Sequence, residues 1–477
     1  MEGKSMEKIP KGTILIMAIL IIGAMVGLLN QSALNTALPN IMGDFQLSTS
    51  TAQWLTTAFA LVTGIVVPIT AFLIQRFTTK QVFVFAMGLL TAGTLLCAVS
   101  PNFGLLLTGR IVQAVGVGIM LPLVQTLAFI LIPVGKRGFT MGMIGLAINF
   151  APAIGPVLNG WLVQDHSWRL LFYILFPFAL LITIAGLWLI KNVTRQVKSK
   201  IDALSMALSS LGFGGVLYGF SVSGSKGWGS TEVLISLGIG CIALGLFVWR
   251  QLTMDNPLLE LRVFTSPSFT LATAISMILM IIMLSAQLLL PIYMQTMLGY
   301  TALKSGLMLL PGAILMGVMS PVAGKLFDKM GARMLVIIGL SLTVVSALLF
   351  SNLTEHTSYA FLMIGYSLRM IGVSLTLLPV VTSGMNSLAP DLIRHGIPVN
   401  TTLRTVAGSI GTALLVTIMT YSGGGLGQTS DVHSLIHGMN VASMVTAGSA
   451  VLALILAFFI KRKEAPVESP AKGVPVK

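Results

Sequence analysis

Fourteen long apolar runs constrain this chain more than any other feature of its sequence. Each run holds about 18 or more residues, which is enough for a helix to cross the hydrocarbon core of a membrane. The charged fraction of 9% and the mean hydropathy of +0.94 lie outside the range of soluble globular domains. The sequence therefore predicts an all-α integral membrane protein with fourteen crossings, at residues 13–38, 52–74, 82–99, 104–131, 138–163, 170–190, 204–222, 233–249, 267–292, 305–324, 334–351, 358–383, 398–421 and 439–460.

The basic residues predict the orientation of these crossings. An even number of crossings places both termini on one side of the membrane. If that side is the cytoplasm, 22 of the 28 basic residues lie in cytoplasmic loops and tails, three lie outside and three lie within helices. Because cytoplasmic loops are enriched in Lys and Arg, we expect a multi-pass membrane protein with both termini cytoplasmic. The net charge of +14 then reflects topology and does not indicate nucleic-acid binding.

Two pairs of segments repeat along the chain. AFLIQRFTTK (71–80) shares its apolar and basic spacing with GKLFDKMGAR (324–333), and GRIVQAVGVGIMLP (109–122) is echoed by LRMIGVSLTLLP (368–379). The repeats put runs 1–6 in register with runs 9–14 and leave runs 7 and 8 as an insertion. Two related halves with a site between them are the layout of alternating-access carriers. We expect a six-helix bundle at 1–190, a basic linker with the inserted helices at 191–262, a second bundle at 263–462 and a disordered cytoplasmic tail at 463–477.

A row of polar residues lies within the first apolar run, in the segment LLNQSALNTALP (28–39). Polar groups at that depth are costly unless they are paired or used. We therefore expect Asn30, Gln31 and Asn35 to line a substrate cavity and to position either the substrate or a nearby arginine. We assign Asn149 and Arg369, in the fifth and twelfth runs, to the same cavity.

The fourth apolar run contains an arginine, in the segment GRIVQAVGVG (109–118). An arginine at the centre of a membrane helix costs about 3 kcal/mol on insertion scales, so other groups must compensate for its charge. Gln113 lies one turn from Arg110 on the same helical face, and Asn30 and Asn35 offer acceptors from another helix. Arg110 either serves function, as intramembrane ionisable groups usually do, or only locks helices together.

Small residues and prolines alternate in the fifth run, GMIGLAINFAPAIGPVLNGW (142–161). Small residues let helices approach closely, and prolines bend a helix. We predict that Gly155, Pro156 and Gly160 form a bend that seals one side of the interface between the halves.

The segment GKLFDKMGAR (324–333) predicts an inner gate. Gly331 would form a tight turn, with Asp328 near a helix end and Arg333 close by. Together with Gly324, these charged groups would tie helix ends in one state and release them in another. The alternative is an ordinary charged turn.

The motifs together resemble the fourteen-helix drug:proton antiporter family of the major facilitator superfamily. LLNQSALNTALP resembles the family's first-helix signature, GRIVQAVGVG its fourth-helix motif and GMIGLAINFAPAIGPVLNG its antiporter motif. GKLFDKMGAR is similar to the superfamily's inner-loop motif, and NTTLRTVAGSIGTAL (400–414) to the thirteenth helix. The NQ-type first helix and the QRFTT loop look closest to lincomycin and multidrug exporters. The resemblance implies the major facilitator fold and export of amphipathic compounds driven by inward proton flow.

The resemblance also implies roles for individual residues. Arg110 and Gln113 would serve proton coupling, Gly155 and Pro156 the sealing bend, and Asp328, Gly331 and Arg333 the inner gate.

The sequence departs from this family pattern at several acidic positions. Asn30 stands where the signature has Asp, and Gln75 and Thr78 replace the Asp and Gly of the first inner-loop copy, which should weaken that latch. The fourteen acidic residues all fall in loops, in tails or at helix ends. A proton carrier needs a group that titrates as access alternates. The candidates are Asp44, Asp165 and Asp328, at helix ends, and we favour Asp165 because it ends the fifth helix.

These observations predict a multidrug efflux transporter that acts as a monomer on small-molecule drugs, with lincosamide-type antibiotics among them. Three interior arginines without an interior acid disfavour dicationic substrates and favour neutral, zwitterionic or weakly basic amphiphiles. The alternatives are an exporter of an endogenous anionic lipid or metabolite, or a carrier with weak proton coupling. We expect no enzymatic activity, no cofactor beyond the proton gradient as energy source, and no metal site.

Overall fold

The structure is a computed structural model, and it describes residues 10–165, 167–194, 196, 202–254, 257–424 and 432–461. Within these ranges the side chains at 11, 33, 35, 36, 39, 49, 50, 152–154, 156–165, 224, 225 and 302 are outside the description. The predicted tail at 463–477 also lies outside the described residues.

Fourteen α-helices form the described part of the chain, as the apolar runs predict. Thirteen of them are long and apolar enough to cross a membrane, and the remaining helix, α5, spans 29 residues. The helices extend past the apolar runs because polar caps and charged end turns belong to the helix; Ser48 and Asn102, for example, cap α2 and α4. Their bounds are α1 Lys11–Phe45, α2 Thr49–Arg76, α3 Thr79–Ala98, α4 Phe103–Leu131, α5 Arg137–Asp165, α6 Arg169–Leu189, α7 Ala203–Lys226, α8 Thr231–Thr253, α9 Pro267–Ile292, α10 Ala302–Met330, α11 Ala332–Leu349, α12 Tyr359–Asn386, α13 Ile393–Ser422 and α14 Val432–Ala457.

Short helical segments join some of these helices. The 3-10 segments η1 and η2 cover Val134–Lys136 and Leu261–Thr265, and the π-helical segment η3 covers Tyr293–Met297.

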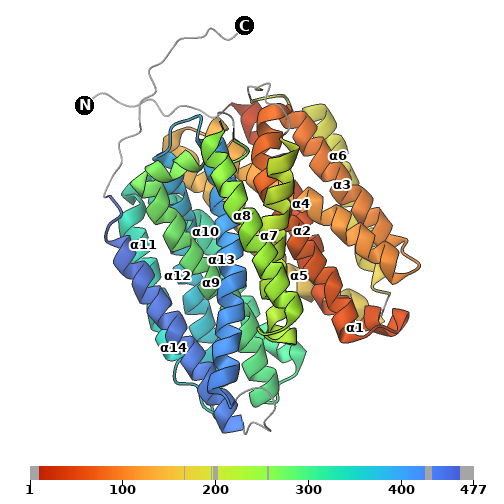
Figure 1. The fold of residues 1–477 in the computed structure, drawn as a ribbon, viewed down its shortest axis with the longest axis vertical. Coiled ribbons are helices and arrows are strands. Elements are labelled where there is room, and N and C mark those ends of the chain that lie inside the picture. The colour runs from red at the N-terminus through yellow and green to blue at the C-terminus, as the bar shows by residue number, and fades with distance from the viewer. Residues whose placement is uncertain are drawn as a thin grey trace.

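The helices pack as two related bundles. In the first, α3 packs on α4 and α6, α4 packs on α2, and α1 packs on α5. In the second, α11 packs on α12 and α14, α12 packs on α10, and α9 packs on α13. Each pair of the first bundle thus recurs eight helices later, and Figure 1 shows α1–α6 and α9–α14 as two groups. The expected architecture of two six-helix bundles with an inserted pair is confirmed.

The inserted helices α7 and α8 pack against each other at the junction of the bundles. α7 contacts both α2 and α13, so it touches both halves, and Figure 1 shows the pair in front of this junction. Fourteen crossings place the start of α1 and the end of α14 on one side, here called the terminal face; the other side is called the opposite face.

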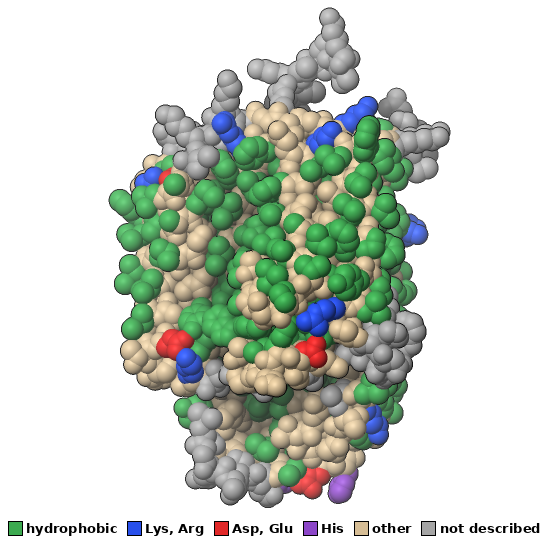
Figure 2. All heavy atoms as spheres, turned by 90° about the vertical axis from the view of Figure 1, so that its right-hand side faces the viewer, with side chains coloured by type: hydrophobic (Ala, Val, Ile, Leu, Met, Phe, Trp, Pro, Cys, Tyr) green, Lys and Arg blue, Asp and Glu red, His purple; other side chains and the backbone are tan. Residues whose placement is uncertain are grey.

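The lateral surface is apolar, as a bilayer requires. Many of its large side chains are exposed, such as Trp188 on α6 (82%) and Trp249 on α8 (67%). Figure 2 shows apolar side chains over much of one lateral face. Exposure of this extent would mark a binding or aggregation surface in a soluble protein, and here it faces lipid.

Candidate functional site

Arg110 is completely buried inside the first bundle. It belongs to a hydrogen-bonded set of Asn30, Thr94, Arg110 and Gln113, which we call the Arg110 network. Its Nη1 donates to the backbone oxygen of Asn30 at 3.1 Å and to Oε1 of Gln113 at 2.9 Å. Its guanidinium carbon lies 4.2 Å from the centre of the Phe59 ring. Groups on α1 and α4 and the aromatic ring of Phe59 on α2 thus hold the cation away from lipid.

The remaining hydrogen bonds of the Arg110 network join Gln113, Asn30 and Thr94. Gln113 Nε2 donates to Asn30 Oδ1 at 3.2 Å and to Thr94 Oγ1 at 2.9 Å, and Asn30 Nδ2 also donates to Thr94 Oγ1 at 3.2 Å. Thr94 donates its own proton to the backbone oxygen of Leu90 at 2.6 Å, which leaves its oxygen free to accept. Of the buried polar atoms in this network, Arg110 Nε lacks a partner within the described residues.

Close packing of α3 on α4 makes this network possible. A Cβ atom on Gly93 would lie 2.7 Å from the backbone nitrogen of Gln113 and 2.7 Å from the backbone oxygen of Gly109. Glycine at position 93 therefore lets the Gln113 amide reach Thr94 on the neighbouring helix.

We expected Asn30 to line a cavity and to position either substrate or Arg110. In the structure its side chain is fully buried, both of its amide atoms serve the Arg110 network, and its backbone oxygen accepts from Arg110. The family signature has an acid at this position. Here an amide stands in its place, and it pairs with Gln113. Gln31 is partly exposed, and the side chain of Asn35 lies outside the described residues.

Arg369 is a buried arginine of the second bundle. It too was expected in the cavity wall, but only 4% of it is exposed, and its Nε donates to Ser346 Oγ on α11 at 3.3 Å. Its guanidinium carbon lies 4.8 Å from the Phe350 ring centre, and its Nη2 has no partner among the described residues. α12 and α11 correspond to α4 and α3, so Arg369 and Arg110 lie at equivalent places in the two bundles, each beside an aromatic ring.

Asn149 lies between the two halves, at the contact of α5 with α10. Its Nδ2, on α5, donates to Ser320 Oγ on α10 at 3.3 Å. α5 packs against α10 along this stretch because Gly142 has no side chain: a Cβ atom there would lie 2.5 Å from the backbone oxygen of Ser320. Gly155 is buried further along α5, and the side chains of Pro156, Gly160 and Asp165 lie outside the described residues. The sealing bend stays a prediction.

Asp328 connects α10 to the start of α5 at the terminal face. Its two carboxylate oxygens accept from the backbone nitrogens of Gly138 and Phe139, each at 2.9 Å. The first turn of a helix carries unpaired N–H groups and partial positive charge, so a carboxylate is stabilised there. We call this arrangement the Asp328 latch.

Glycines make the Asp328 latch close. A Cβ atom on Gly324 would lie 2.1 Å from the backbone oxygen of Gly138, and one on Gly138 would lie 2.5 Å from Asp328 Oδ1. Gly331 adopts a φ of 78° between α10 and α11, a conformation that favours glycine. Arg333 is partly exposed, and within the described residues it forms no ion pair with Asp328. The predicted latch thus binds backbone N–H groups, where we had expected basic side chains.

Two further contacts join the halves at the terminal face. Arg137, at the start of α5, donates from Nη1 to Asn386 Oδ1 at the end of α12 (2.7 Å), and from Nη2 to the backbone oxygen of Phe129 near the end of α4 (2.7 Å). Gln75 on α2 is hydrogen-bonded to His395 on α13, with 2.7 Å between their Nε2 atoms.

The Gln75 contact was not predicted. Gln75 aligns with Asp328 in the repeated loop segments, and α13 corresponds to α5. The first loop copy therefore forms a latch at the equivalent place, with a neutral side chain. Sequence analysis also missed Thr94, Phe59 and Arg137, because nothing in their local sequence shows which helix they face.

Comparison with known proteins decides the family. The sequence model of the Major Facilitator Superfamily matches residues 20–413. The chain belongs to the Major Facilitator Superfamily. It is a transporter and not an enzyme.

Among bacterial relatives, the chain is 48% identical to the Bacillus subtilis protein named "Uncharacterized MFS-type transporter YcnB", covering 98% of this chain and 99% of that one. It is 42% identical to the lincomycin resistance protein LmrB of Listeria monocytogenes, covering 96% and 98%. Its fold is similar to that of the human organic anion transporter MFSD10, with a TM-score of 0.69, 13% identity and coverage of 94% and 100%.

Proposed function

We propose that this Major Facilitator Superfamily transporter exports amphipathic compounds, including lincosamide-type antibiotics, in exchange for protons. The observation that carries the alternating-access part is the Asp328 latch, with the glycine-lined contact of α5 and α10 beside it. It closes the terminal face through a few hydrogen bonds that a rigid-body movement of one half would break. The drug-export part rests on 42% identity to a protein named for lincomycin resistance.

In this proposal the terminal face is cytoplasmic and the protein acts as a monomer in a bacterial cell membrane. The excess of basic residues in the loops of that face supports the orientation. The structure then corresponds to a state closed towards the cytoplasm, and breaking the Asp328 latch would admit substrate from that side.

Proton coupling would act through acids at helix ends. Asp44 is engaged at the opposite face, where its Oδ2 accepts from Trp168 Nε1 at 2.9 Å and pairs with Arg169 Nη1 at 3.1 Å. Asp328 is better placed, because a protonated carboxyl accepts weaker hydrogen bonds than a carboxylate. Proton binding at Asp328 would then loosen the latch. Asp165 stays the other proposed carrier, with Arg110 and Gln113 in a supporting role.

The test is uptake of lincomycin and ethidium into everted membrane vesicles. We expect saturable uptake that depends on an imposed proton gradient, collapses with a protonophore and is lost in Asp328→Asn, with equal amounts of protein in the membrane. Uptake that ignores the gradient would contradict proton antiport, while absence of lincomycin uptake alone would contradict only the choice of substrate.

The second proposed function is export of an endogenous anionic amphiphile. Two atoms favour it, because Arg369 Nη2 and Arg404 Nε are buried without a partner among the described residues. A carboxylate or phosphate would pair with such groups once the second bundle opens. Stronger inhibition of vesicle uptake by an alkyl phosphate than by an alkylammonium of equal chain length would support this function over the first.

A further inference from the structure

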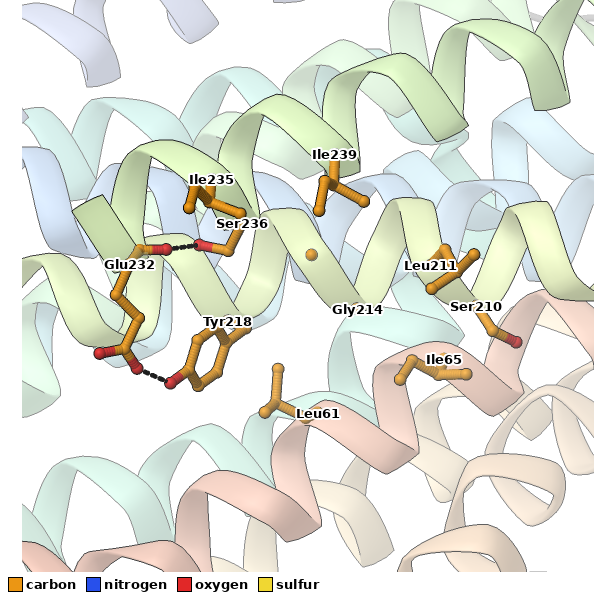
Figure 3. A pocket seen from close by; sticks show the side chains of 11 residues that line it. Leu61, Ile65, Ser210, Leu211, Gly214, Tyr218, Glu232, Ile235, Ser236 and Ile239 are labelled. Atoms are coloured by element: carbon orange, nitrogen blue, oxygen red, sulfur yellow. Dashed lines mark hydrogen bonds between the residues drawn. The ribbon is translucent and has the colours of Figure 1, made fainter. Parts of the chain in front are cut away.

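A groove runs along α7, between α2 and α8, outside the Arg110 network and the Asp328 latch. Its volume is about 580 Å³. Figure 3 shows Leu61 and Ile65 on the α2 side, Ile235 and Ile239 on the α8 side, and Gly214 on α7 between them. Ile235 and Ile239 are 55% and 51% exposed, so the groove is open to the side. It lies on the membrane-embedded surface, where apolar material must fill it.

The length of the groove is close to the depth of one leaflet of a bilayer. Along α7 it extends from Ser210 to Tyr218, across the middle of the helix, and its Tyr218 end reaches Glu232 at the start of α8, towards the opposite face. Eight residues of helix cover about 12 Å, and one leaflet contributes about 15 Å of hydrocarbon. The groove therefore has room for one acyl chain of a lipid in the leaflet of the opposite face.

The end of the groove nearest the opposite face is polar and carries both signs of charge. Tyr218 donates its hydroxyl proton to one carboxylate oxygen of Glu232, and Lys226 forms an ion pair with the other. The Trp54 ring stacks on Tyr218 with 5.9 Å between centroids, and Trp and Tyr favour the level of the lipid headgroups. The side chains of Lys226 and Glu232 are 52% and 39% exposed, so both can reach a headgroup.

We propose that this groove is a lipid site that takes one acyl chain of a phospholipid with a zwitterionic, amine-bearing headgroup. The lipid phosphate would lie at Lys226 and the lipid ammonium at Glu232. An exposed ion pair contributes only about 0–1 kcal/mol, so Lys226 and Glu232 exchange their partners at little cost. A purely anionic headgroup would place negative charge beside Glu232 with no ammonium to compensate. The charge pattern thus selects the zwitterionic lipid.

The experiment is native mass spectrometry of the purified, delipidated full-length protein with added phosphatidylethanolamine or phosphatidylglycerol of the same chains. The wild-type protein should retain one phosphatidylethanolamine, with about a fivefold preference over phosphatidylglycerol, which corresponds to about 1 kcal/mol. Equal retention of the two lipids by the wild-type protein would overturn the proposal.

A space-filling variant tests the groove itself. Gly214→Leu places a side chain on the floor of the groove, where the added Cβ first meets only the end of the Ile65 side chain, at 3.0 Å. Retention of lipid should be lost. Gly245→Leu is the matched control, because this glycine of α8 lies away from the groove and its Cβ position is open. If the two variants retained lipid equally, the groove would not be the site.

The headgroup assignment is tested separately, and its variant leaves the apolar walls unchanged. The double change Lys226→Gln and Glu232→Gln should retain one lipid but lose the preference between the two headgroups. A preference that survives this change would contradict the assignment. Displacement of the retained lipid by lincomycin at its transported concentrations would identify the groove as a drug site and overturn the proposal.

Discussion

Arg110 is a buried cation whose charge is met, among the described residues, by dipoles and a ring, without an acid. The backbone oxygen of Asn30, Oε1 of Gln113 and the face of Phe59 surround it, and the four ion pairs formed by the described residues all lie elsewhere. Such an arrangement holds a positive charge at a fixed place in the first bundle. It also makes each member of the network sensitive to loss of a partner, because an unsatisfied buried polar group costs about 1–3 kcal/mol.

The first prediction concerns Asn30. Asn30→Ala removes an acceptor from Gln113 and a donor to Thr94, so we expect a loss of stability of about 1–3 kcal/mol and clearly reduced drug uptake. Uptake into everted vesicles, normalised to the protein in the membrane, is the measurement. The control is Thr382→Val, because that buried hydroxyl donates to Leu378 of its own helix. Unchanged uptake in Asn30→Ala would contradict a role of the network in transport.

At the scale of helices, α7 and α8 are tied together at the terminal face by Asp202. Its carboxylate caps α7 by accepting from Ser205 N at 3.2 Å and also accepts from Nε and Nη2 of Arg250 on α8, both at 3.1 Å. Burial raises the pKa of the Asp202 carboxyl, but the hydrogen bonds from Arg250 and Ser205 outweigh it and leave the pKa below its usual value. The inserted pair thus carries its own polar clamp outside the membrane.

The second prediction follows from that lowered pKa. A carboxyl whose pKa is lower in the folded state stabilises the fold above its unfolded pKa of about 3.9, and this contribution is lost as the pH falls through the folded value. Asp202→Asn should therefore lower the thermal midpoint at pH 7, with about 1 kcal/mol lost from this partly exposed pair. The difference from wild type should stay constant between pH 5 and pH 8 and shrink below pH 4, as followed by tryptophan fluorescence. A difference that grows on acidification would contradict this assignment.

The third prediction concerns the contact of α5 with α10. In Gly138→Ala the new methyl group would lie 2.5 Å from Asp328 Oδ1 and 2.6 Å from the backbone oxygen of Gly324, so the helices must separate. Spin labels at Lys80→Cys and Met334→Cys, in a background without the native cysteines, should report a longer distance across the terminal face. Gly135→Ala is the matched control, because its Cβ position is open. Equal distances in both variants would contradict the glycine requirement.

At the scale of the whole molecule, two equivalent latches of unequal chemistry hold the halves together. Asp328 binds two N–H groups of α5, and Gln75 binds one side chain of α13. Hydrogen bonds to charged groups contribute about 1.5–3 kcal/mol, and neutral ones about 1 kcal/mol. We therefore expect the interface to be held more strongly on the side of α5 and α10, where the loop copy keeps its Asp.

The fourth prediction compares the two latches. Asp328→Ala should increase the population open at the terminal face more than Gln75→Ala does, by about 2- to 30-fold for a difference of about 0.5–2 kcal/mol. The same pair of spin labels measures both variants, and the double variant should exceed either one. If Gln75→Ala had the larger effect, the charge of Asp328 would not be what makes its latch the stronger one.

Much of the fold was predictable because membrane crossings follow from local composition. An apolar run of sufficient length must become a helix wherever water is absent, since the backbone has no other partner. The predicted number of helices is confirmed. So is the correspondence between each helix of the first bundle and the helix eight places later in the chain. The structure buries Asn30 and Arg369 within their bundles, which the sequence did not indicate, because helical position in a sequence does not tell the inside of a bundle from the wall between bundles.

The sequence by itself determined that fourteen helices cross a membrane, that they form two repeats, and that three arginines within them have no acid at their depth. These facts depend on residue type and on short spacing, which hydrocarbon constrains strongly. Only the tertiary structure decided that Arg110 points into the first bundle, that Asp328 binds the N-terminus of α5, and that Gln75 meets His395. Such contacts depend on how each helix is rotated and displaced against its neighbours, and packing across the whole molecule sets those two quantities.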